Sequence, residues 1–188
     1  MNNLRLVVNR PTALPDGLKG SGSFPCVEAF SDEFDYLLRT LRRLGVHRDD
    51  VEDVAHEVFL VLYQSWDKYD SSRPFRPYLF GVAFRVACNH VRKRRKEIPV
   101  SFLEVSDLGD RPDQVIEAEQ RRALVLKALE RITMSRRAVL IMHDIDGLGM
   151  NEIATALSIY RFTGYSRLRK ARKEFAEAVL SLSKESER

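Results

Sequence analysis

The sequence predicts an all-α fold made of two small helical domains joined by a linker, the C-terminal one containing a helix-turn-helix. Apolar residues recur at helical spacing in several segments, and no segment shows the alternation typical of a strand. Residues 98–114 interrupt this spacing with proline, glycine and acidic residues, which predicts the linker. Residues 144–175 then place a short helix, a turn and a strongly basic helix in succession, which is the pattern of a helix-turn-helix.

Domain boundaries follow from the same patterns. Proline and glycine recur through the first 27 residues, which predicts a mostly disordered leader. The chain therefore divides into a leader 1–27, a first domain 28–97, a linker 98–114, a second domain 115–182 and a tail 183–188.

Three helices are expected in the first domain. Apolar residues at helical spacing run from Phe34 to Leu44, and Gly45 supplies a stop. A second helix spans 51–66, with Asp49 or Asp50 placed to cap its start. After the turn-rich loop 67–74, a third amphipathic helix begins near Tyr78 and ends in the basic run 92–96.

The second domain is expected to be helical throughout, with spans at 116–132 and 135–143 before the helix-turn-helix. In that motif the chain should bend at Ser158 and Ile159. Ser158 stands where such a turn frequently has glycine. Gly164 lies inside the second helix, where it costs about 1 kcal/mol relative to alanine unless it permits a close approach of helix or DNA.

Composition excludes several classes of protein. The chain has 188 residues, is 44% hydrophobic and carries a net charge of +4. Cys26, in a loop-like segment, and Cys88, in a predicted helix, fit neither a disulfide framework nor a metal site, which favours a reducing, cytoplasmic setting. The chain shows no signal-peptide pattern and no run of about twenty apolar residues, so we expect no membrane insertion. We expect no cofactor and no metal.

Two expected helices carry faces of opposite charge. Arg85, Asn89, Arg92 and Lys96 share one face of the third helix and can follow phosphates. The second helix begins with an acidic cluster that would repel DNA, consisting of Asp49, Asp50, Glu52, Asp53 and Glu57. This cluster is either a protein-docking surface or a helix N-terminus satisfied by its macrodipole.

The second helix of the helix-turn-helix has an almost purely cationic exposed side, and Glu174 is its first acidic residue. The cations are Arg161, Arg167, Arg169, Lys170, Arg172 and Lys173. They indicate a phosphate backbone as counter-surface, or else a solvated basic helix in an ordinary bundle. The hydroxyl groups of Thr163 and Ser166 are short enough to reach phosphates or base edges.

Aromatic residues flank the start of the third helix. Tyr69, Phe75 and Tyr78 lie beside the polar loop 67–74 and a basic helix, a combination that can grip unstacked bases. They can equally be core residues at a helix start. We expect Phe75 in the core and leave Tyr78 open.

Three segments in order, 49–70, 75–95 and 129–175, resemble the extracytoplasmic-function (ECF) branch of the bacterial sigma factors, over about Phe30 to Leu180. They are similar to that family's docking helix for RNA polymerase, its minus-ten reading helix and its minus-thirty-five reading domain. The resemblance implies a factor that binds core RNA polymerase and directs promoter-specific initiation, as a monomer when free. It leaves open whether an anti-sigma factor also binds.

The resemblance and the charged faces together give the expected site residues. Polymerase would be contacted by Asp53, Val54, Glu57, Val58 and Phe59. Minus-ten DNA would be contacted by Arg85, Cys88, Asn89, Arg92 and Lys93. Minus-thirty-five DNA would be contacted by Arg161, Thr163, Tyr165, Ser166, Arg167, Arg169 and Lys170.

Other functions remain as alternatives. A helix-turn-helix repressor or activator would bind duplex DNA without polymerase, usually as a symmetric dimer. A sigma-like decoy would bind polymerase or an antagonist and open no promoter. Catalysis is not expected, because His56-Glu57 lacks a second histidine four residues after the first and His143-Asp144 has no imidazole partner on its own predicted helix.

Overall fold

The computed structural model describes residues 25–97 and 113–186, and within these ranges the chain forms helices and no strand, as the all-α prediction requires. The first half contains α1 (Pro25–Asp32), α2 (Phe34–Leu44), α3 (Val51–Gln64) and α4 (Phe75–Glu97), with short 3-10 helices η1 (Arg48–Asp50) and η2 (Trp66–Lys68). The second half contains α5 (Asp113–Glu130), α6 (Met134–Leu140), a π-helical turn η3 (Ile141–Ile145), α7 (Met150–Ala156) and α8 (Arg161–Ser186).

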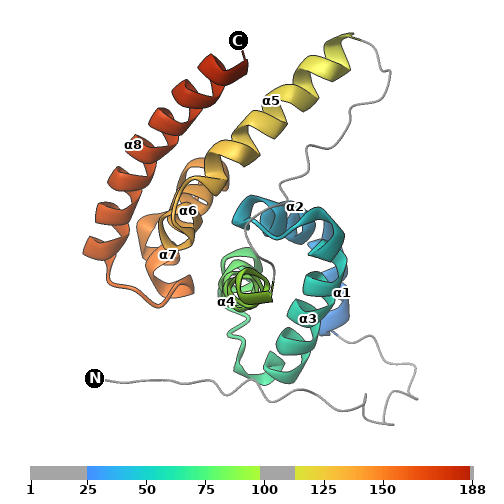
Figure 1. Ribbon diagram of the computed structural model, residues 1–188. Helices are drawn as coiled ribbons and strands as arrows, with labels where there is room; N and C mark the ends of the chain where they lie inside the picture. The colour runs from blue at the N-terminus through green and yellow to red at the C-terminus, as the bar shows by residue number, and fades with distance from the viewer. Residues whose placement is uncertain (1–24, 98–112, 187–188) are drawn as a thin grey trace.

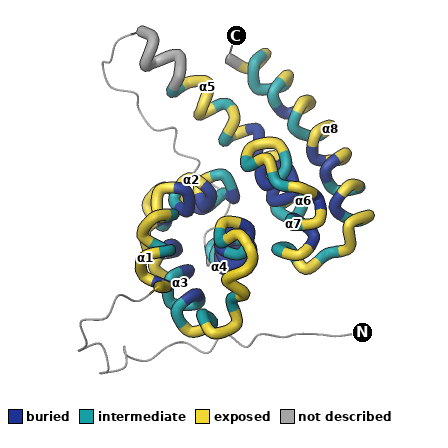
Figure 2. Tube along the Cα trace, turned by 180° about the vertical axis from the view of Figure 1, so that it is seen from behind, coloured by how far each residue is buried: buried dark blue, intermediate teal, exposed yellow. Residues whose placement is uncertain are grey.

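Helix α4 lies at the centre of the molecule, between α2 and α3 on one side and α7 on the other (Figure 1). The buried sides of these helices face one another, and their outer sides are exposed (Figure 2). Phe80, Leu37 and Ile153 come from the three groups of helices and are fully buried in one continuous hydrophobic cluster. The two expected helical units therefore pack directly against each other.

Several expected boundaries are confirmed and one changes. Gly45 ends α2 with a left-handed φ of 93°, as its position predicts. Helix α1 begins at Pro25, inside the segment interpreted as a leader, and Cys26 is buried in this helix rather than lying in a loop. The rest of the expected leader and nearly all of the expected linker fall outside the described residues, and Asp113 already belongs to α5.

Asp50 does not cap α3 as predicted, because its carboxylate makes no capping hydrogen bond. Instead it lies 3.0 Å from His90 Nε2 and forms an ion pair with Arg94, so it attaches the start of α3 to α4. Burial raises the pKa of Asp50, but the hydrogen bond with His90 and the charge of Arg94 outweigh it, and the net pKa lies below its usual range.

The two halves are joined by a buried guanidinium. Arg137 of α6 is only 5% exposed, and its Nη1 atom donates a hydrogen bond of 2.6 Å to the carbonyl oxygen of Leu44, the last residue of α2. Its Nη2 atom donates to the carbonyl oxygens of Glu130 and Ile132 at the end of α5, at 2.9 and 3.0 Å. A Cβ atom at Gly45 would collide with this guanidinium, so the glycine provides room as well as the left-handed turn.

Two further contacts close the interface between the halves. Tyr36 Oη in α2 donates a hydrogen bond of 2.7 Å to Asp146 Oδ2, just after η3. Burial raises the pKa of Asp146 even though Tyr36 and Arg43 favour its ionised form. At Gly81, α4 comes so close to the end of α7 that a Cβ atom would lie 2.5 Å from the carbonyl oxygen of Ala156.

The Asp50 contact predicts a specific pH dependence of stability. Its folded-state pKa lies below the unfolded value, so its stabilising contribution is present above about pH 4 and is lost as the pH falls through the folded-state pKa. We expect Asp50→Asn to lower the free energy of unfolding by about 1 kcal/mol at pH 7 and by much less near pH 2. Urea unfolding across this range measures the difference, with the exposed Asp35→Asn as control. A difference that stays constant with pH would contradict the assignment.

The Gly81 contact predicts that Gly81→Ala loosens the packing of the two halves. Alanine favours the helix by up to about 1 kcal/mol, but overpacking against a backbone carbonyl costs about 1 to 3 kcal/mol. We therefore expect a net loss of about 1 kcal/mol in unfolding experiments and a larger radius of gyration in small-angle X-ray scattering. An equally compact and more stable variant would show that the contact is not tight.

Candidate nucleic-acid and protein interfaces

The first half of α8 is oriented by a buried stripe. Gly164, Leu168 and Ala171 face inward, and Phe175 is half-buried on the same side. A Cβ atom at Gly164 would collide with the Sδ atom of Met150, so this glycine permits the close approach of α8 to the start of α7. The sequence left open whether Gly164 permits the close approach of a helix or of DNA, and in the structure it permits the close approach of a helix. The opposite face of α8 is left to solvent.

All seven residues expected to contact minus-thirty-five DNA lie on this first half of α8. Arg161, Tyr165, Arg169 and Lys170 are exposed, whereas Thr163, Ser166 and Arg167 are half-buried. The structure therefore brings the whole set together on one segment of about three turns, which begins with Arg161.

The cations of this segment differ from those further along the helix. Among the described residues, no carboxylate forms an ion pair with any cation of the first set, which comprises Arg161, Arg167, Arg169 and Lys170. In contrast, Arg172 pairs with Asp144 at 2.6 Å and Lys173 lies 3.8 Å from Glu177. The cations nearest the turn are thus available to an external anion, and the next ones stabilise the fold.

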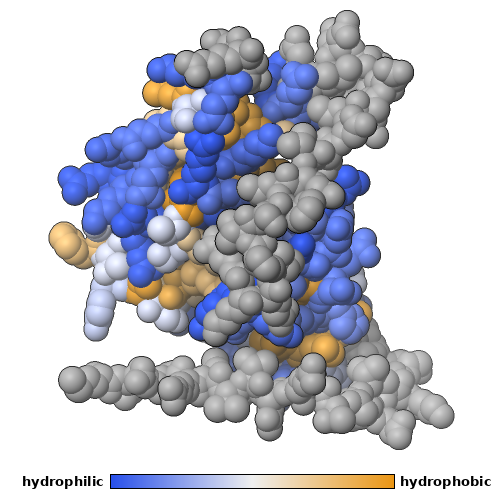
Figure 3. Space-filling view, in the orientation of Figure 1, coloured by the Kyte–Doolittle hydropathy of each residue, from blue (hydrophilic) through white to orange (hydrophobic). Residues whose placement is uncertain are grey.

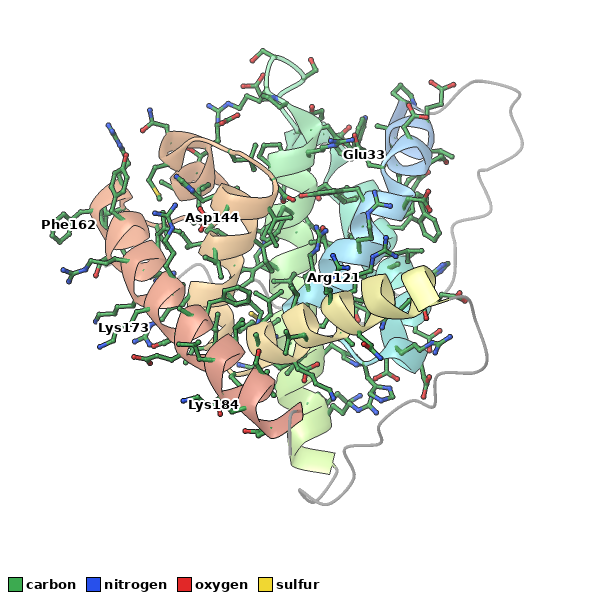
Figure 4. The ribbon with its side chains drawn as sticks, turned by 90° about the horizontal axis from the view of Figure 1, so that it is seen from above. Glu33, Arg121, Asp144, Phe162, Lys173 and Lys184 are labelled. Carbon is green, nitrogen blue, oxygen red and sulfur yellow. The ribbon has the colours of Figure 1, made fainter. Side chains whose placement is uncertain are left out.

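Sequence reasoning missed two aromatic residues at this site. Tyr160, just before α8, is 86% exposed, and Phe162 is 85% exposed. Phe162 points away from the body of the molecule (Figure 4). An apolar protrusion stands at this end of α8, next to a hydrophilic stretch of the surface (Figure 3). The sequence does contain a signal for the exposure of Phe162, because this residue does not share the helical spacing of the buried stripe and therefore lies on another face of α8.

Other helices contribute polar groups beside the start of α8. One hollow lies between α8 and the start of α6 and is lined by Ser135, Arg136 and Ser166 among others. A second hollow is lined in part by Asn151 and Thr155 of α7. Because these residues come from separate segments, their proximity to α8 could not be read from local spacing.

The turn of the helix-turn-helix falls where the sequence predicted it. Helix α7 ends at Ala156, and Ser158 adopts a left-handed φ of 53°. The Ile159 N–H donates a hydrogen bond of 2.9 Å to the carbonyl oxygen of Ala154, which closes the end of the helix. Serine is strained in this conformation, as its replacement of a usual glycine implies.

The residues expected to contact minus-ten DNA lie on α4. Arg85, Asn89, Arg92 and Lys93 are exposed, and Arg92 donates a hydrogen bond of 3.1 Å to Asn89 Oδ1. Cys88 is half-buried, with its Sγ atom 3.4 Å from Met134 Sδ at the start of α6. Burial raises the pKa of the Cys88 thiol. One member of the set therefore contacts the second half of the molecule instead of solvent.

The aromatic residues beside this helix pack on each other. The ring of Tyr69 lies 5.5 Å from Phe75 and 5.0 Å from Tyr78, and Trp66 lies 5.1 Å from Tyr69, all between centroids. Phe75, Tyr78 and Trp66 also pack against the core. Phe75, which was expected in the core, and Tyr78, which was left open, are both partly buried and pack against the edge of the core.

The expected polymerase-contacting set on α3 is divided by burial. Asp53 and Glu57 are exposed, whereas Val54 is 1% exposed and Val58 is 0% exposed, so these two valines belong to the core and cannot touch a partner. Phe59 is half-buried, with its ring centroid 5.0 Å from that of Phe30 in α1. The accessible part of the set is therefore acidic with an aromatic edge.

The His143-Asp144 pair makes structural contacts. His143 Nδ1 lies 2.7 Å from Asp144 Oδ1, and Arg172 also pairs with Asp144, so this motif ties η3 to α8. The described part of the chain contains no group of three His, Cys, Asp or Glu side chains able to hold a metal ion. Within the same ranges, no helix is long and apolar enough to cross a membrane.

Comparison with known proteins identifies the first half. A family model of sigma-70 region 2 matches residues 30–97, from the end of α1 to the end of α4. The chain is 25% identical over 155 residues to the RNA polymerase sigma factor NccH of Alcaligenes xylosoxydans xylosoxydans, covering 77% of this chain and 81% of that protein. It is 24% identical over 144 residues to the ECF RNA polymerase sigma-E factor of Escherichia coli K12, covering 71% and 75%.

Together, the region 2 match and these relatives support an ECF sigma factor. The fold of this sigma factor agrees with that assignment. It is similar to the sigma factor RpoE of Bartonella quintana, solved in complex with the anti-sigma factor NepR, with a TM-score of 0.60, 18% identity and coverage of 81% of this chain and 97% of that one.

The strained turn of the sigma factor predicts a stabilising substitution. Ser158→Gly removes the strain of a left-handed serine from the folded state, which stabilises the protein by about 1 kcal/mol. Part of this gain is offset because glycine has greater conformational freedom in the unfolded chain. We expect a net gain of about 0.5 kcal/mol and a higher Tm in thermal unfolding. Ser183→Gly, in regular α8 helix, is the matched control and should lower the Tm. Equal losses in both variants would contradict the assigned strain.

Proposed function

We propose that this sigma factor binds core RNA polymerase through the exposed face of α3 and directs promoter-specific transcription initiation by reading minus-ten DNA with α4 and minus-thirty-five DNA with α8. The observation that carries the proposal is the division of charge over one molecule. An exposed acidic face on α3 accompanies two exposed basic faces on α4 and α8. An autonomous helix-turn-helix regulator needs no such acidic face.

The docking surface consists of Asp53, Glu57 and the exposed edge of Phe59. The carboxylates repel DNA and attract a basic partner surface, and the aromatic edge adds apolar contact area. Val54 and Val58 contribute by fixing α3 in the core, which holds the two carboxylates one helical turn apart on the outer side.

The basic face of α4 follows the phosphates of minus-ten DNA through Arg85, Arg92 and Lys93, and Asn89 offers both donors and acceptors to a base. Cys88 joins this face only when α6 moves away from α4, because Met134 covers it. Promoter binding by α4 therefore favours separation of the two halves.

DNA geometry also requires separation. Elements named for positions ten and thirty-five lie about 25 base pairs apart, which is about 85 Å along B-form DNA. A compact domain of this length has a radius of gyration of only about 16 Å. Fifteen residues join α4 to α5, and a chain of that length spans at most about 50 Å. Two separated halves on this connection span the distance, and the packed form does not.

Partners and setting follow from the same proposal. Sigma factors in general are not enzymes, and we assign no catalytic step to this chain. Polymerase and promoter are in the cytoplasm, where the protein would act, and it is a monomer when free. The relative from Bartonella quintana was solved with an anti-sigma factor, and we propose a partner of that class for this chain.

The function is tested by transcription with sigma-free core polymerase on a library of genomic fragments, with sequencing of the RNA starts. We expect discrete starts that share two upstream motifs. Asp53→Lys with Glu57→Lys should abolish the starts and weaken polymerase binding at least about tenfold. Asp32→Lys with Asp35→Lys reverses two exposed carboxylates elsewhere in the first half and is the matched control. Duplex DNA binding without polymerase and no new transcripts would instead support the autonomous regulator.

A second pair of variants separates promoter binding from polymerase binding. Arg169→Ala with Lys170→Ala removes two unpaired cations, so we expect promoter affinity to fall at least about tenfold while polymerase affinity is unchanged. Lys127→Ala with Lys184→Ala removes two exposed charges far from the turn and should change neither affinity. Equal loss of both affinities in the first pair would contradict the division between α3 and α8.

A further inference from the structure

Exposed aromatic rings gather at the start of α8. Tyr160, Phe162 and Tyr165 lie within six residues of chain and are 86%, 85% and 52% exposed. Single apolar residues on a protein surface are common, but three large rings in one short segment mark a binding surface. The hydroxyl groups of the two tyrosines can form hydrogen bonds with water, which offsets part of the cost of exposing their rings. The side chain of Phe162 has no polar atom and lacks this compensation.

Phe162 shares a face with residues already assigned to DNA. Counting along α8, Tyr165, Ser166 and Arg169 follow it by three, four and seven residues, which places all four on the side opposite the buried stripe. Helix-turn-helix proteins contact base edges with the first residues of this helix. Phe162 is the second residue of α8 and points away from the protein (Figure 4).

We propose that Phe162 is a specificity-determining residue that packs against the C5-methyl group of a thymine in the major groove of the upstream promoter element. Among the four bases of DNA only thymine presents a methyl group in this groove, and apolar side chains such as phenylalanine read it by contact. The proposal rests on the proposed function and adds a base preference that the cationic residues do not supply.

The surroundings of Phe162 favour DNA over a protein as the occupant. Arg161, Arg167, Arg169 and Lys170 lie on the same first turns of α8 and have no ion-pair partner among the described residues, and no acidic residue occurs on α8 before Glu174. Phe162 also lines both of the hollows described above, of which one contains serine and threonine hydroxyl groups and the other contains Asn151 and Thr155. An apolar ring between hydrogen-bonding groups and free cations matches a groove floor between two phosphate backbones.

The test uses the full-length chain with core polymerase and a promoter found by the transcription experiment. Each thymine of the upstream motif is replaced in turn by deoxyuridine, which removes the methyl group and leaves the base-pairing groups. We expect the wild-type protein to lose about fourfold in promoter affinity at one or two positions, the effect of one methyl group. Phe162→Ala should lose about tenfold on the thymine promoter and show no further loss with deoxyuridine at those positions.

Leu180→Ala is the matched control, because it truncates another exposed apolar side chain of α8, 63% exposed and far from the turn. It should keep the full deoxyuridine effect. The proposal is overturned if Phe162→Ala keeps that effect, if it loses polymerase affinity in proportion to promoter affinity, or if the upstream motif contains no thymine. Absence of discrete starts with the wild-type protein overturns the proposed function as well, so the two failures are distinguishable.

Discussion

The packing of the molecule depends on the buried guanidinium of Arg137. A buried charge is costly unless it is hydrogen-bonded, and here both terminal nitrogens of the guanidinium donate to carbonyl groups at or just after the ends of two helices, where the backbone lacks partners of its own. Helix C-termini also carry partial negative charge, which favours a cation. The arrangement fixes α6 against both α2 and α5, and it requires Gly45, since any side chain there would displace the guanidinium. Helix α8 packs on α6 and also on α5 and α7, so the position at which this guanidinium holds α6 contributes to the orientation of the basic segment.

Local pattern in the sequence was sufficient for much of the fold. The periodicity of α3 and α4, the stop at Gly45 and the turn at Ser158 each depend on neighbours within a few residues, and these predictions are confirmed. The cap was expected from Asp49 or Asp50, and Asp50 does not provide it because its carboxylate contacts His90, forty residues away, instead. The contact of Tyr36 with Asp146 spans 110 residues and has no local signal. The candidate site likewise combines features that local sequence predicts with features that it does not. Its cations were predicted from the basic composition of the segment, whereas predicting the exposure of Phe162 required knowing which face of α8 is buried.

Charge on α8 is divided between folding and recognition. Arg172 pairs with Asp144 of η3 and Arg136 of α6 pairs with Glu174, and these two pairs link α8 to η3 and α6. Lys173 pairs with Glu177 within α8 itself. Exposed ion pairs contribute little free energy each, but they remove the cations that would otherwise repel one another along the helix. The unpaired cations are left within the first turns, next to the exposed aromatic rings. The unpaired positive charge of this basic segment is therefore concentrated at the start of α8 rather than spread along the helix.

The packed form must also be able to open if one molecule is to reach two promoter elements. When the halves separate, Arg137 loses its bond to Leu44 but keeps both bonds within the second half, so no buried charge is left without partners. After separation, water forms hydrogen bonds with both the freed donor and the freed acceptor, so the loss of the Arg137 to Leu44 bond costs only about 1 kcal/mol. The loss of the bond between Tyr36 and Asp146 costs a similar amount. The larger cost is the apolar contact of α4 with α7 around Gly81. A partner can supply free energy of that size only through surfaces that it binds more tightly in the open form. Under the proposed function, the face of α4 that includes Cys88 is such a surface, because Met134 covers Cys88 in the packed form.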